Sequence, residues 1–421
     1  MKRILTLAVI AFTMLGSTKA QETEVIGKSN IKLNSRMMTP EAMWAMGRIG
    51  ATEASPNGDE VVYQVGYYSV KQNKSHQVIC IMDADGANNK QLTTSSKSET
   101  DPTWLDAETI AFISGGEIWT MKADGSNRRQ VSKTDGNVEG FKFSPDRSKV
   151  IILKSLPFHE IIKKNPDDLP KATGRRVTDL MYRHWDHYVE SIQHPFVFSV
   201  GDGFAIAGNG TDILEGEPYE CPMEPFGGIE QLAWSNDSKQ IAYTCRKKTG
   251  LEYSISTDSD IFLYNIDTKT TRNLCKPANY VAPKVDPTRT LAIQSVNDKE
   301  NLKNNVGYDQ NPQFSPDGKY IAWLSMERDG YEADLNRLCI CDLQTGDKRY
   351  IDWQSDVDAF CWAPQKDKQA KLFFLSVWHG CVNMYSVTQK DEVKQLTEDW
   401  ADWTKARSEE RRVGKECRSR W

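Results

Sequence analysis

The fold of this chain is decided by a short stretch, Phe314-Ser-Pro-Asp-Gly-Lys-Tyr-Ile-Ala-Trp323. The proline fixes φ at the second position of a tight turn, the aspartate accepts local backbone hydrogen bonds, and the glycine tolerates the exit geometry. An aromatic residue before the turn and the Ile-Ala-Trp run after it predict the two strands of a β-hairpin.

The same module recurs along the chain. Its other copies are Ala54-Ser-Pro-Asn-Gly-Asp-Glu-Val-Val-Tyr63, the shortened Trp104-Leu-Asp-Ala-Glu-Thr-Ile-Ala-Phe112, Phe143-Ser-Pro-Asp-Arg-Ser-Lys-Val150, Trp234-Ser-Asn-Asp-Ser-Lys-Gln-Ile-Ala-Tyr243 and Trp362-Ala-Pro-Gln365. A second strand-turn-strand element follows the copies; Met82–Thr93 and Met121–Ser132 share six of twelve positions. Each unit therefore has about four strands in roughly 40–50 residues, which is typical of a propeller blade. We expect an all-β fold, a β-propeller with WD40-like blades, over a β-sandwich or separate hairpins.

Two insertions interrupt the repeat. Ser144 and Ser235 are 91 residues apart, and Ser235 and Ser315 are 80 residues apart. The first gap contains Phe158–Pro195, for which we expect a short helix around Val177–Tyr188, and the second contains a polar stretch, Lys276–Val306. Insertions of this kind predict a specialised surface on the propeller.

The first twenty residues have the pattern of a secretory signal peptide. A basic start is followed by an apolar run from Ile4 to Leu15 and by small residues at Thr18 and Ala20. An ordinary N-terminal strand or helix is the alternative. The pattern predicts export, and therefore a periplasmic or secreted protein without a membrane partner after signal cleavage.

The formal net charge of −5 is the sum of unequal parts. The signal region contributes +3 and the segment from Lys405 onward +4, so the body between them carries about −12. An acidic body disfavours nucleic acid as a partner.

The nine cysteines have no C-x-x-C spacing. Cys339 and Cys341 alternate along a predicted strand and point to one face, a poor geometry for a mutual disulfide. We expect mostly buried free thiols, no metal site and no cofactor.

Longer stretches carry a family resemblance. The module resembles the propeller repeats of TolB-like proteins and of the prolyl-oligopeptidase family of serine peptidases. Asp179-Leu-Met-Tyr-Arg-His-Trp-Asp186, Phe226-Gly-Gly228, Ser256-Thr-Asp-Ser-Asp-Ile-Phe-Leu-Tyr264 and Asn311-Pro-Gln-Phe-Ser-Pro-Asp-Gly318 are similar to dipeptidyl-peptidase 5-like enzymes. The resemblance implies an α/β-hydrolase domain after the propeller, with a Ser nucleophile on a G-x-S-x-G elbow followed by Asp and His. It also implies that the propeller walls the active site and admits short peptides, from which dipeptides are released.

The chain departs from this pattern at its C-terminal end. It has no G-x-S-x-G motif; the nearest string, Gly27-Lys-Ser-Asn-Ile31, ends in isoleucine. The repeat breaks off after Trp403, and 405–421 resembles no blade. We interpret 21–404 as an incomplete propeller whose parent has about seven blades, with the last blade or blades and the α/β-hydrolase domain absent, and 405–421 as a non-native tail; a basic C-terminal helix is the alternative. Without a nucleophile, a base and an oxyanion hole, the chain alone is expected to be inactive, with no catalytic residues of its own.

Arg183 is the candidate substrate-binding residue. Its guanidinium suits a carboxylate, either a peptide C-terminus or a structural partner such as Asp179 or Asp186. His184, His187 and His194 form the histidine cluster of the sequence; packing, a metal and substrate contact are the three interpretations. The Glu-Glu doublet Glu409–Glu410 lies in the tail, so the residues that bind a substrate ammonium stay unassigned.

Two functions follow. The first is the non-catalytic propeller part of a secreted dipeptidyl-peptidase-type enzyme, which gates the access of short peptides to the missing domain. The alternative is a stand-alone periplasmic TolB-like propeller that acts as a binding or scaffold module. Because an incomplete ring exposes strand edges, we expect the chain to be marginally soluble or to self-associate.

Overall fold

The computed structural model describes residues 25–32, 36–158, 162–163, 167–281, 304–364 and 370–405. The predicted signal peptide (1–20) and the predicted tail (405–421) except Lys405 lie outside these ranges, and so do Cys417 and the Glu409–Glu410 doublet. Those predictions are therefore not tested.

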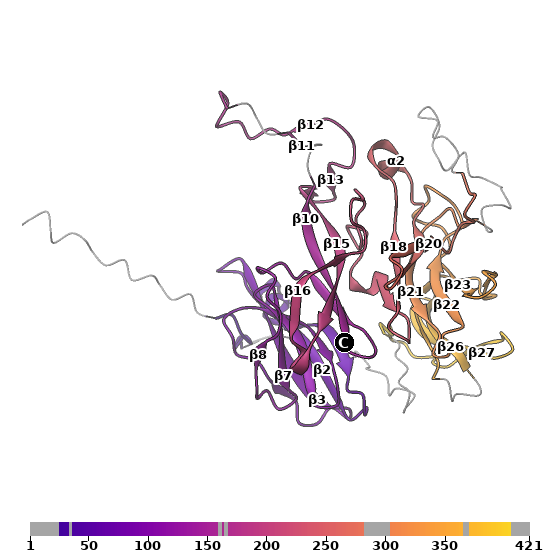
Figure 1. Ribbon diagram of the computed structural model, residues 1–421. Helices are drawn as coiled ribbons and strands as arrows, with labels where there is room; N and C mark the ends of the chain where they lie inside the picture. The colour runs from indigo at the N-terminus through magenta and orange to yellow at the C-terminus, as the bar shows by residue number, and fades with distance from the viewer. Residues whose placement is uncertain are drawn as a thin grey trace, which may run out of the picture.

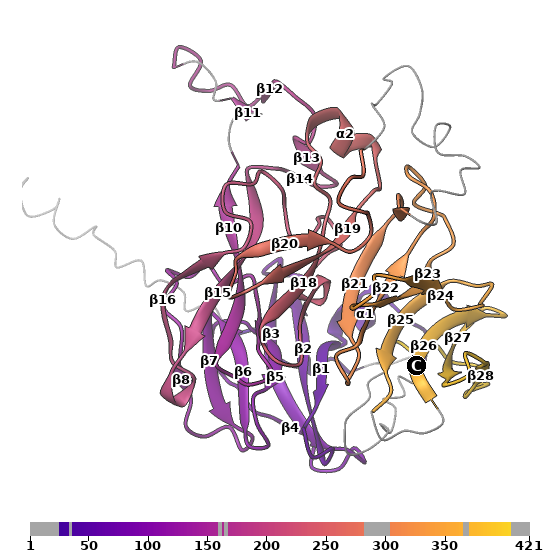
Figure 2. The same ribbon diagram turned by 45° about the vertical axis from the view of Figure 1, so that its right-hand side comes forward.

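Six antiparallel four-stranded sheets follow one another along the chain, and Figures 1 and 2 show them arranged as the blades of a β-propeller. Blade 1 contains β1 (Arg48–Ala54), β2 (Glu60–Ser69), β3 (Lys74–Asp83) and β4 (Lys90–Gln91); blade 2 contains β5 (Glu99–Trp104), β6 (Thr109–Ser114), β7 (Glu117–Lys122) and β8 (Arg129–Gln130). Blade 3 contains β9 (Gly140–Phe143), β10 (Lys149–Pro157), β15 (Ser191–Val200) and β16 (Ile206–Asp212); blade 4 contains β17 (Leu232–Trp234), β18 (Gln240–Cys245), β19 (Asp260–Asn265) and β20 (Thr270–Asn273). Blade 5 contains β21 (Asp309–Phe314), β22 (Tyr320–Ser325), β23 (Arg337–Asp342) and β24 (Lys348–Tyr350); blade 6 contains β25 (Val357–Trp362), β26 (Ala370–Trp378), β27 (Cys381–Thr388) and β28 (Val393–Gln395). The predicted all-β propeller is confirmed.

The connections divide the propeller into two faces. Each blade is an up-and-down meander, so its first-to-second and third-to-fourth turns lie at one end, which we call the turn face. The second-to-third connections and the links to the next blade lie at the other end, the insertion face. Figure 1 shows β11 (Ile162–Lys163), β12 (Arg176–Val177), β13 (Arg183–His184) and α2 (Gly250–Ile255) together at the insertion face. None of the helices in the described part of the chain has the length and apolar character needed to cross a membrane.

A buried serine hydroxyl closes the repeated turn on the turn face. In four blades the hydroxyl donates to the carboxylate or amide oxygen two residues later, at 2.6 Å each: Ser55 to Asn57, Ser144 to Asp146, Ser235 to Asp237 and Ser315 to Asp317. The same hydroxyls accept the backbone N–H five residues on, at 2.9–3.0 Å. The serine thus joins the ends of the turn, which explains why the repeat keeps Ser and Asp or Asn together.

The hydrophobic cores lie between neighbouring blades. Separate clusters join blades 1 and 2, 2 and 3, 3 and 4, 4 and 5, and 5 and 6. Four tryptophans of the repeated module and its strands, Trp104, Trp234, Trp323 and Trp362, are buried there. Because a single sheet can bury its two faces only against its neighbours, each blade depends on the next.

Tryptophans on the first strands fasten the blades together in pairs. The indole Nε1 donates to a backbone carbonyl of the preceding blade: Trp104 to Glu53 at 3.3 Å, Trp234 to Lys142 at 2.9 Å and Trp362 to Gln313 at 3.0 Å. In each acceptor blade the carbonyl belongs to the residue just before the end of the first strand, so the bond repeats with the same geometry. It links blade 1 to 2, 3 to 4 and 5 to 6.

The end of the described chain lies beside its beginning. Trp403 is buried against Leu375 and Met384 of blade 6, and the Lys405 ammonium donates to the carbonyl of Thr52 in β1 at 2.8 Å. Within the described ranges, no hydrophobic cluster joins blade 6 to blade 1. A seventh blade, expected for the parent, is not tested by these residues.

The cysteine prediction is confirmed for the described cysteines. All eight of them are free, and six are buried. Cys339 and Cys341 both lie on β23, and neither forms a disulfide.

We predict that Asp146→Asn makes the stability less dependent on acid pH. The Ser144 hydroxyl and the Ser148 N–H and hydroxyl lower the pKa of Asp146 well below its usual value of 3.8. A carboxyl with a depressed folded pKa contributes stability that is present above the unfolded pKa and is lost as the pH falls toward the folded one. The difference in Tm between wild type and variant should therefore be largest near neutral pH, and it should shrink as the pH falls below about 4. A difference that stays constant down to about pH 2 would contradict the assignment.

We also predict that Trp234→Phe destabilises the propeller by about 1–2 kcal/mol, because it leaves the half-buried Lys142 carbonyl without its indole donor. Trp400→Phe is the matched control, since Trp400 is 94% exposed. The midpoint of denaturant unfolding, followed by fluorescence and circular dichroism, measures both. Equal midpoints for the two variants would show that the indole bond does not hold the blades.

Candidate functional site

The insertion face bears nearly all of the irregular structure. The connection from β10 to β15 contains β11, β12, β13 and β14 (His187–Tyr188), and the connection from β18 to β19 contains α2. The link from blade 3 to blade 4 contains η2 (Ile229–Gln231), and α1 (Pro40–Ala45) precedes blade 1. A third short helix, η1 (Asp202–Phe204), lies on the turn face.

Exposed large hydrophobic side chains gather on the same face. Apart from Val25 and Ile31 in the N-terminal segment, every one among the described residues lies in an insertion-face connection or at the adjoining strand end. They are Met37, Met38, Met43, Trp44, Met46, Ile49, Val70, Leu169, Val177, Leu180, Trp185, Phe226, Leu251, Ile255, Val281, Val377, Trp378, Leu396 and Trp400. The turn face has none in the described ranges. Contiguous exposed apolar surface is typical of interaction sites in general.

Trp185 and Phe226 form the most prominent apolar feature of this face. Their side chains are 77% and 76% exposed, and their rings meet edge to face with centroids 5.0 Å apart. They come from two different connections, so tertiary structure alone brings them together.

The helix expected around Val177–Tyr188 is wrong. The segment is extended: β13 and β14 pair as a short hairpin, with His184 opposite His187 and Trp185–Asp186 as its turn. Met181 has φ of +64°, in the left-handed region, so a helix cannot continue through it. The two histidines therefore face each other across a hairpin rather than along one side of a helix.

Buried Glu220 joins three insertion-face connections. His184 Nε2 lies 2.9 Å from one carboxylate oxygen of Glu220, and the Tyr253 hydroxyl donates to the other. All three side chains are buried. The Arg246 guanidinium covers the Tyr253 ring at 3.9 Å and donates to the Ser256 carbonyl at 2.8 Å. Glu220 thus ties the β13–β14 hairpin to α2.

Glu220 and Tyr253 could not be predicted from the sequence. Neither belongs to a motif, and their partner His184 is 36 residues from Glu220. The long gap between Ser144 and Ser235 and the block around Arg183–Asp186 were the two signals that this region is specialised.

Arg183, the predicted substrate-binding residue, is exposed on the hairpin. Its Nε donates to the Trp185 carbonyl at 3.1 Å, and its guanidinium lies 5.2 Å from the Tyr188 ring centroid. The Asp186 carboxylate lies 2.9 Å from His187 Nδ1. The His187 hydrogen bond in the first place, and the positive charge of Arg183 among the smaller causes, lower the pKa of Asp186. The guanidinium keeps donors available at the surface, and its substrate role stays a prediction.

Glu224 places a second carboxylate near that of Glu220. It is half-buried, and Gln193 donates to it at 3.2 Å. Burial, and after it the negative charge of Glu220, raise the pKa of Glu224. A carboxyl in such a position gains most from a cation that approaches it.

The histidine cluster of the sequence does not converge on one point. His184 binds Glu220, exposed His187 binds Asp186, and buried His194 binds Asp212 at 2.8 Å. Each imidazole has its own carboxylate partner, and the His184 and His187 rings meet with their centroids 5.7 Å apart.

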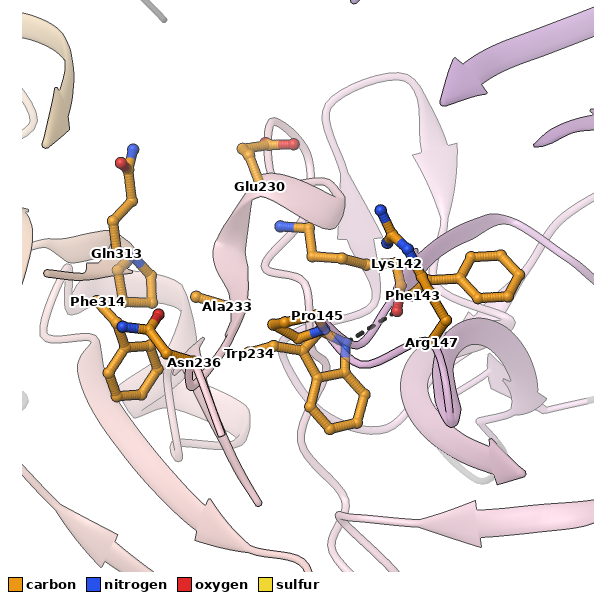
Figure 3. Close-up of a pocket in the computed structure, with 11 residues that line it drawn as sticks. Lys142, Phe143, Pro145, Arg147, Glu230, Ala233, Trp234, Asn236, Gln313 and Phe314 are labelled. Carbon is orange, nitrogen blue, oxygen red and sulfur yellow. Dashed lines mark hydrogen bonds between the residues drawn. The ribbon is translucent and has the colours of Figure 1, made fainter. Parts of the chain in front are cut away.

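A cavity of about 400 Å³ opens among the first strands of blades 3, 4 and 5. Figure 3 shows Lys142, Arg147, Trp234, Asn236 and Phe314 around it, with the Trp234 indole bonded to the Lys142 carbonyl. Most of its lining residues lie at the turn-face ends of the strands, away from the Glu220 group.

We predict that Tyr253→Phe loosens the insertion face without unfolding the blades. Loss of a hydroxyl bond to a buried carboxylate costs about 1.5–3 kcal/mol. Amide hydrogen exchange should therefore rise in α2 and in the β13–β14 hairpin but not in blade 1. Tyr188→Phe, whose ring packs under Arg175 and Arg183, is the control and should leave exchange unchanged. Uniform exchange changes across all blades would contradict a local role for Glu220.

Comparisons with known proteins agree with this architecture. No family model matches the chain. Dipeptidyl-peptidase 5 of Porphyromonas gingivalis is 40% identical over 378 residues, which cover 87% of this chain and 51% of that protein. Dipeptidyl-peptidase 5 of Porphyromonas endodontalis is 40% identical over 309 residues, which cover 72% of this chain and 40% of that protein.

Solved structures agree on the fold. The acylaminoacyl peptidase of Pyrococcus horikoshii matches with a TM-score of 0.51 at 15% identity, over 84% of this chain and 46% of that one. An acylaminoacyl peptidase in complex with a peptide chloromethyl ketone matches with a TM-score of 0.52 at 14% identity, over 85% of this chain and 47% of the other. The chain spans about half the length of the curated relatives it matches. Over that shared part, it is a β-propeller that belongs to the dipeptidyl-peptidase 5-like branch of the prolyl-oligopeptidase family.

Proposed function

We propose that this chain is the propeller part of an exported dipeptidyl-peptidase-type serine peptidase. In this proposal the insertion face docks on a catalytic part that corresponds to the other half of the relatives, and the ring limits entry to short peptides. The observation that carries the proposal is the one-sided apolar surface, since the exposed large hydrophobic residues of the blades lie on the insertion face.

The size of the relatives supports the same assignment. Dipeptidyl-peptidase 5 of P. gingivalis is about twice as long as the part that this chain matches. A partner of that size offers the area that a stable interface needs, about 800 Å² on each side. Exposed aromatic residues such as Trp185 and Phe226 are the type that contributes most to such interfaces.

Groups of both charges on the insertion face suit the two ends of a short peptide. Arg183 can hold a carboxylate or a carbonyl oxygen through its exposed donors. Glu224, whose pKa is raised by burial, can receive the N-terminal ammonium of a substrate. Arg183 is two residues from Trp185 in the chain, and Glu224 is two residues from Phe226. In this proposal the docking surface and the path of the peptide therefore share one region.

The docking proposal predicts that this chain copurifies with the remainder of P. gingivalis dipeptidyl-peptidase 5 when the two are expressed as separate polypeptides. The pair should hydrolyse dipeptide amides in a reaction that a serine-directed inhibitor blocks, whereas this chain alone should not. Combined Trp185→Ser and Phe226→Ser changes should weaken association at least about tenfold, as expected for two interface aromatics.

The matched control changes the opposite face. Lys239→Ser and Lys319→Ser alter exposed side chains of the turn face and should leave association intact. Hydrolysis by this chain alone would overturn the proposal. A soluble monomer that binds no remainder would favour the stand-alone TolB-like scaffold instead.

A further inference from the structure

Three potential metal ligands meet inside the junction of blades 4 and 5. Asp260 begins β19, Cys275 follows β20, and Asp309 begins β21. One ligand atom from each lies within 4.8 Å of the other two. Cys275 and Asp309 are fully buried, and Asp260 is largely so. Among the described residues this is the one group of its kind.

Cys275 occupies a position that other blades fill with a hydroxyl. Thr93, Ser132 and Thr397 each accept a backbone N–H from the third strand of their blade, at 3.0, 2.8 and 3.0 Å. In blade 4 the Cys275 sulfur accepts the N–H of Ile261 at 3.2 Å instead. A hydroxyl would serve this structural bond equally well, so the bond does not explain the thiol.

Asp309 also departs from its counterpart in the repeat. The equivalent acid of blade 2, Glu99, forms an ion pair with Arg128. Asp309 has no such cation: its Oδ1 accepts the Trp323 indole at 2.6 Å and the Asn305 amide at 3.0 Å. Its Oδ2 has no hydrogen-bond partner among the described residues, although the side chain is completely buried. Burying this oxygen without a partner costs free energy, and a ligand at Oδ2 would relieve that cost.

Neighbouring donors hold the three groups in the orientation of ligands. Asn273 Nδ2 donates to Asp260 Oδ2 at 2.7 Å. The Ile261 N–H donates to the Cys275 sulfur, and the Trp323 indole donates to Asp309 Oδ1. N–H donors of this kind orient metal ligands and favour their anionic forms.

The nearby lysines leave the Asp309–Cys275 side open. The Lys276 ammonium bridges Asp258 and Asp260. The Lys348 ammonium contacts the Cys275 carbonyl and the Asn305 amide oxygen. Neither bonds to Asp309 Oδ2 or to the Cys275 sulfur, so an ion would use these two atoms first and share Asp260 with Lys276.

We propose that Asp309, Cys275 and Asp260 form a binding site for a divalent transition metal of the zinc class, which fastens blade 4 to blade 5 at the base of the 274–308 connection. A thiolate together with carboxylate oxygens is a ligand set that Zn²⁺ accepts in four-coordinate sites. Binding replaces the thiol proton of Cys275, and any proton on Asp309, with the metal ion, and the protons leave to solvent.

The test loads the full chain with Zn²⁺, removes free metal by gel filtration and measures retained zinc by elemental analysis. One equivalent should be retained and should raise the Tm. With Co²⁺ as the probe, a thiolate-to-cobalt charge-transfer band should appear. Cys275→Ser restores the hydroxyl that the repeat uses elsewhere, so it should fold normally while losing both the retained zinc and the band. Asp309→Asn should also lose them, and Asp260→Asn should weaken retention less.

A matched control places a thiol at the same repeat position in another blade. Thr93→Cys puts a cysteine at the blade-1 position that corresponds to Cys275, where the acid that follows in the repeat, Glu99, already forms an ion pair with Arg128. This variant should bind no additional zinc. No retained zinc in the wild-type chain would overturn the proposal. Retention that survives Cys275→Ser would overturn it as well, since that metal would be adventitious, held for example at exposed His187 and Asp186. None of these outcomes depends on whether the insertion face docks on a catalytic part.

Discussion

The packing of each sheet against its neighbours is the constraint on which the rest of the propeller depends, and at three of the five described junctions a hydrogen bond from a tryptophan indole to a carbonyl of the preceding blade reinforces it. Trp104, Trp234 and Trp362 each place a large ring in the core between two sheets and an N–H on the neighbouring first strand. A four-stranded sheet is too small to fold alone, so the indole both buries area and fixes how one sheet meets the next. The serine-closed turns then hold the ends of those first strands on the turn face.

Once the strands alternate up and down, the two faces acquire different properties. Turns of the Ser-Pro-Asp-Gly type are short and polar, and they leave the turn face without exposed large hydrophobic side chains in the described ranges. All long connections lie at the opposite end, where Glu220 gathers three of them around a buried carboxylate. Tertiary structure thus separates a face built for closing the blades from a face suited to docking and peptide recognition.

The junction of blades 4 and 5 shows how a repeat can carry a site. Where the repeat is followed, a hydroxyl accepts the backbone N–H, and the acid of blade 2 meets an arginine. Where it is not followed, Cys275 and Asp309 bring a thiol and an uncompensated carboxylate into one buried space. A departure from an otherwise regular pattern is informative because the regular residue would satisfy the fold at lower cost.

The sequence by itself determined the blades, since the Ser-Pro-Asp-Gly turns and the strands beside them are local structures that neighbouring residues specify. It also located the two insertions and the specialised block around Arg183. It did not reveal the hairpin at 183–188, Glu220 as the partner of His184, or the Trp185–Phe226 pair. The Glu220–His184 contact and the Trp185–Phe226 pair join residues that are tens of positions apart. In the hairpin region, the left-handed Met181 and the pairing of β13 with β14 exclude the helix that we expected. Only the packing of one blade on the next decided them, because that packing alone fixes which connections meet.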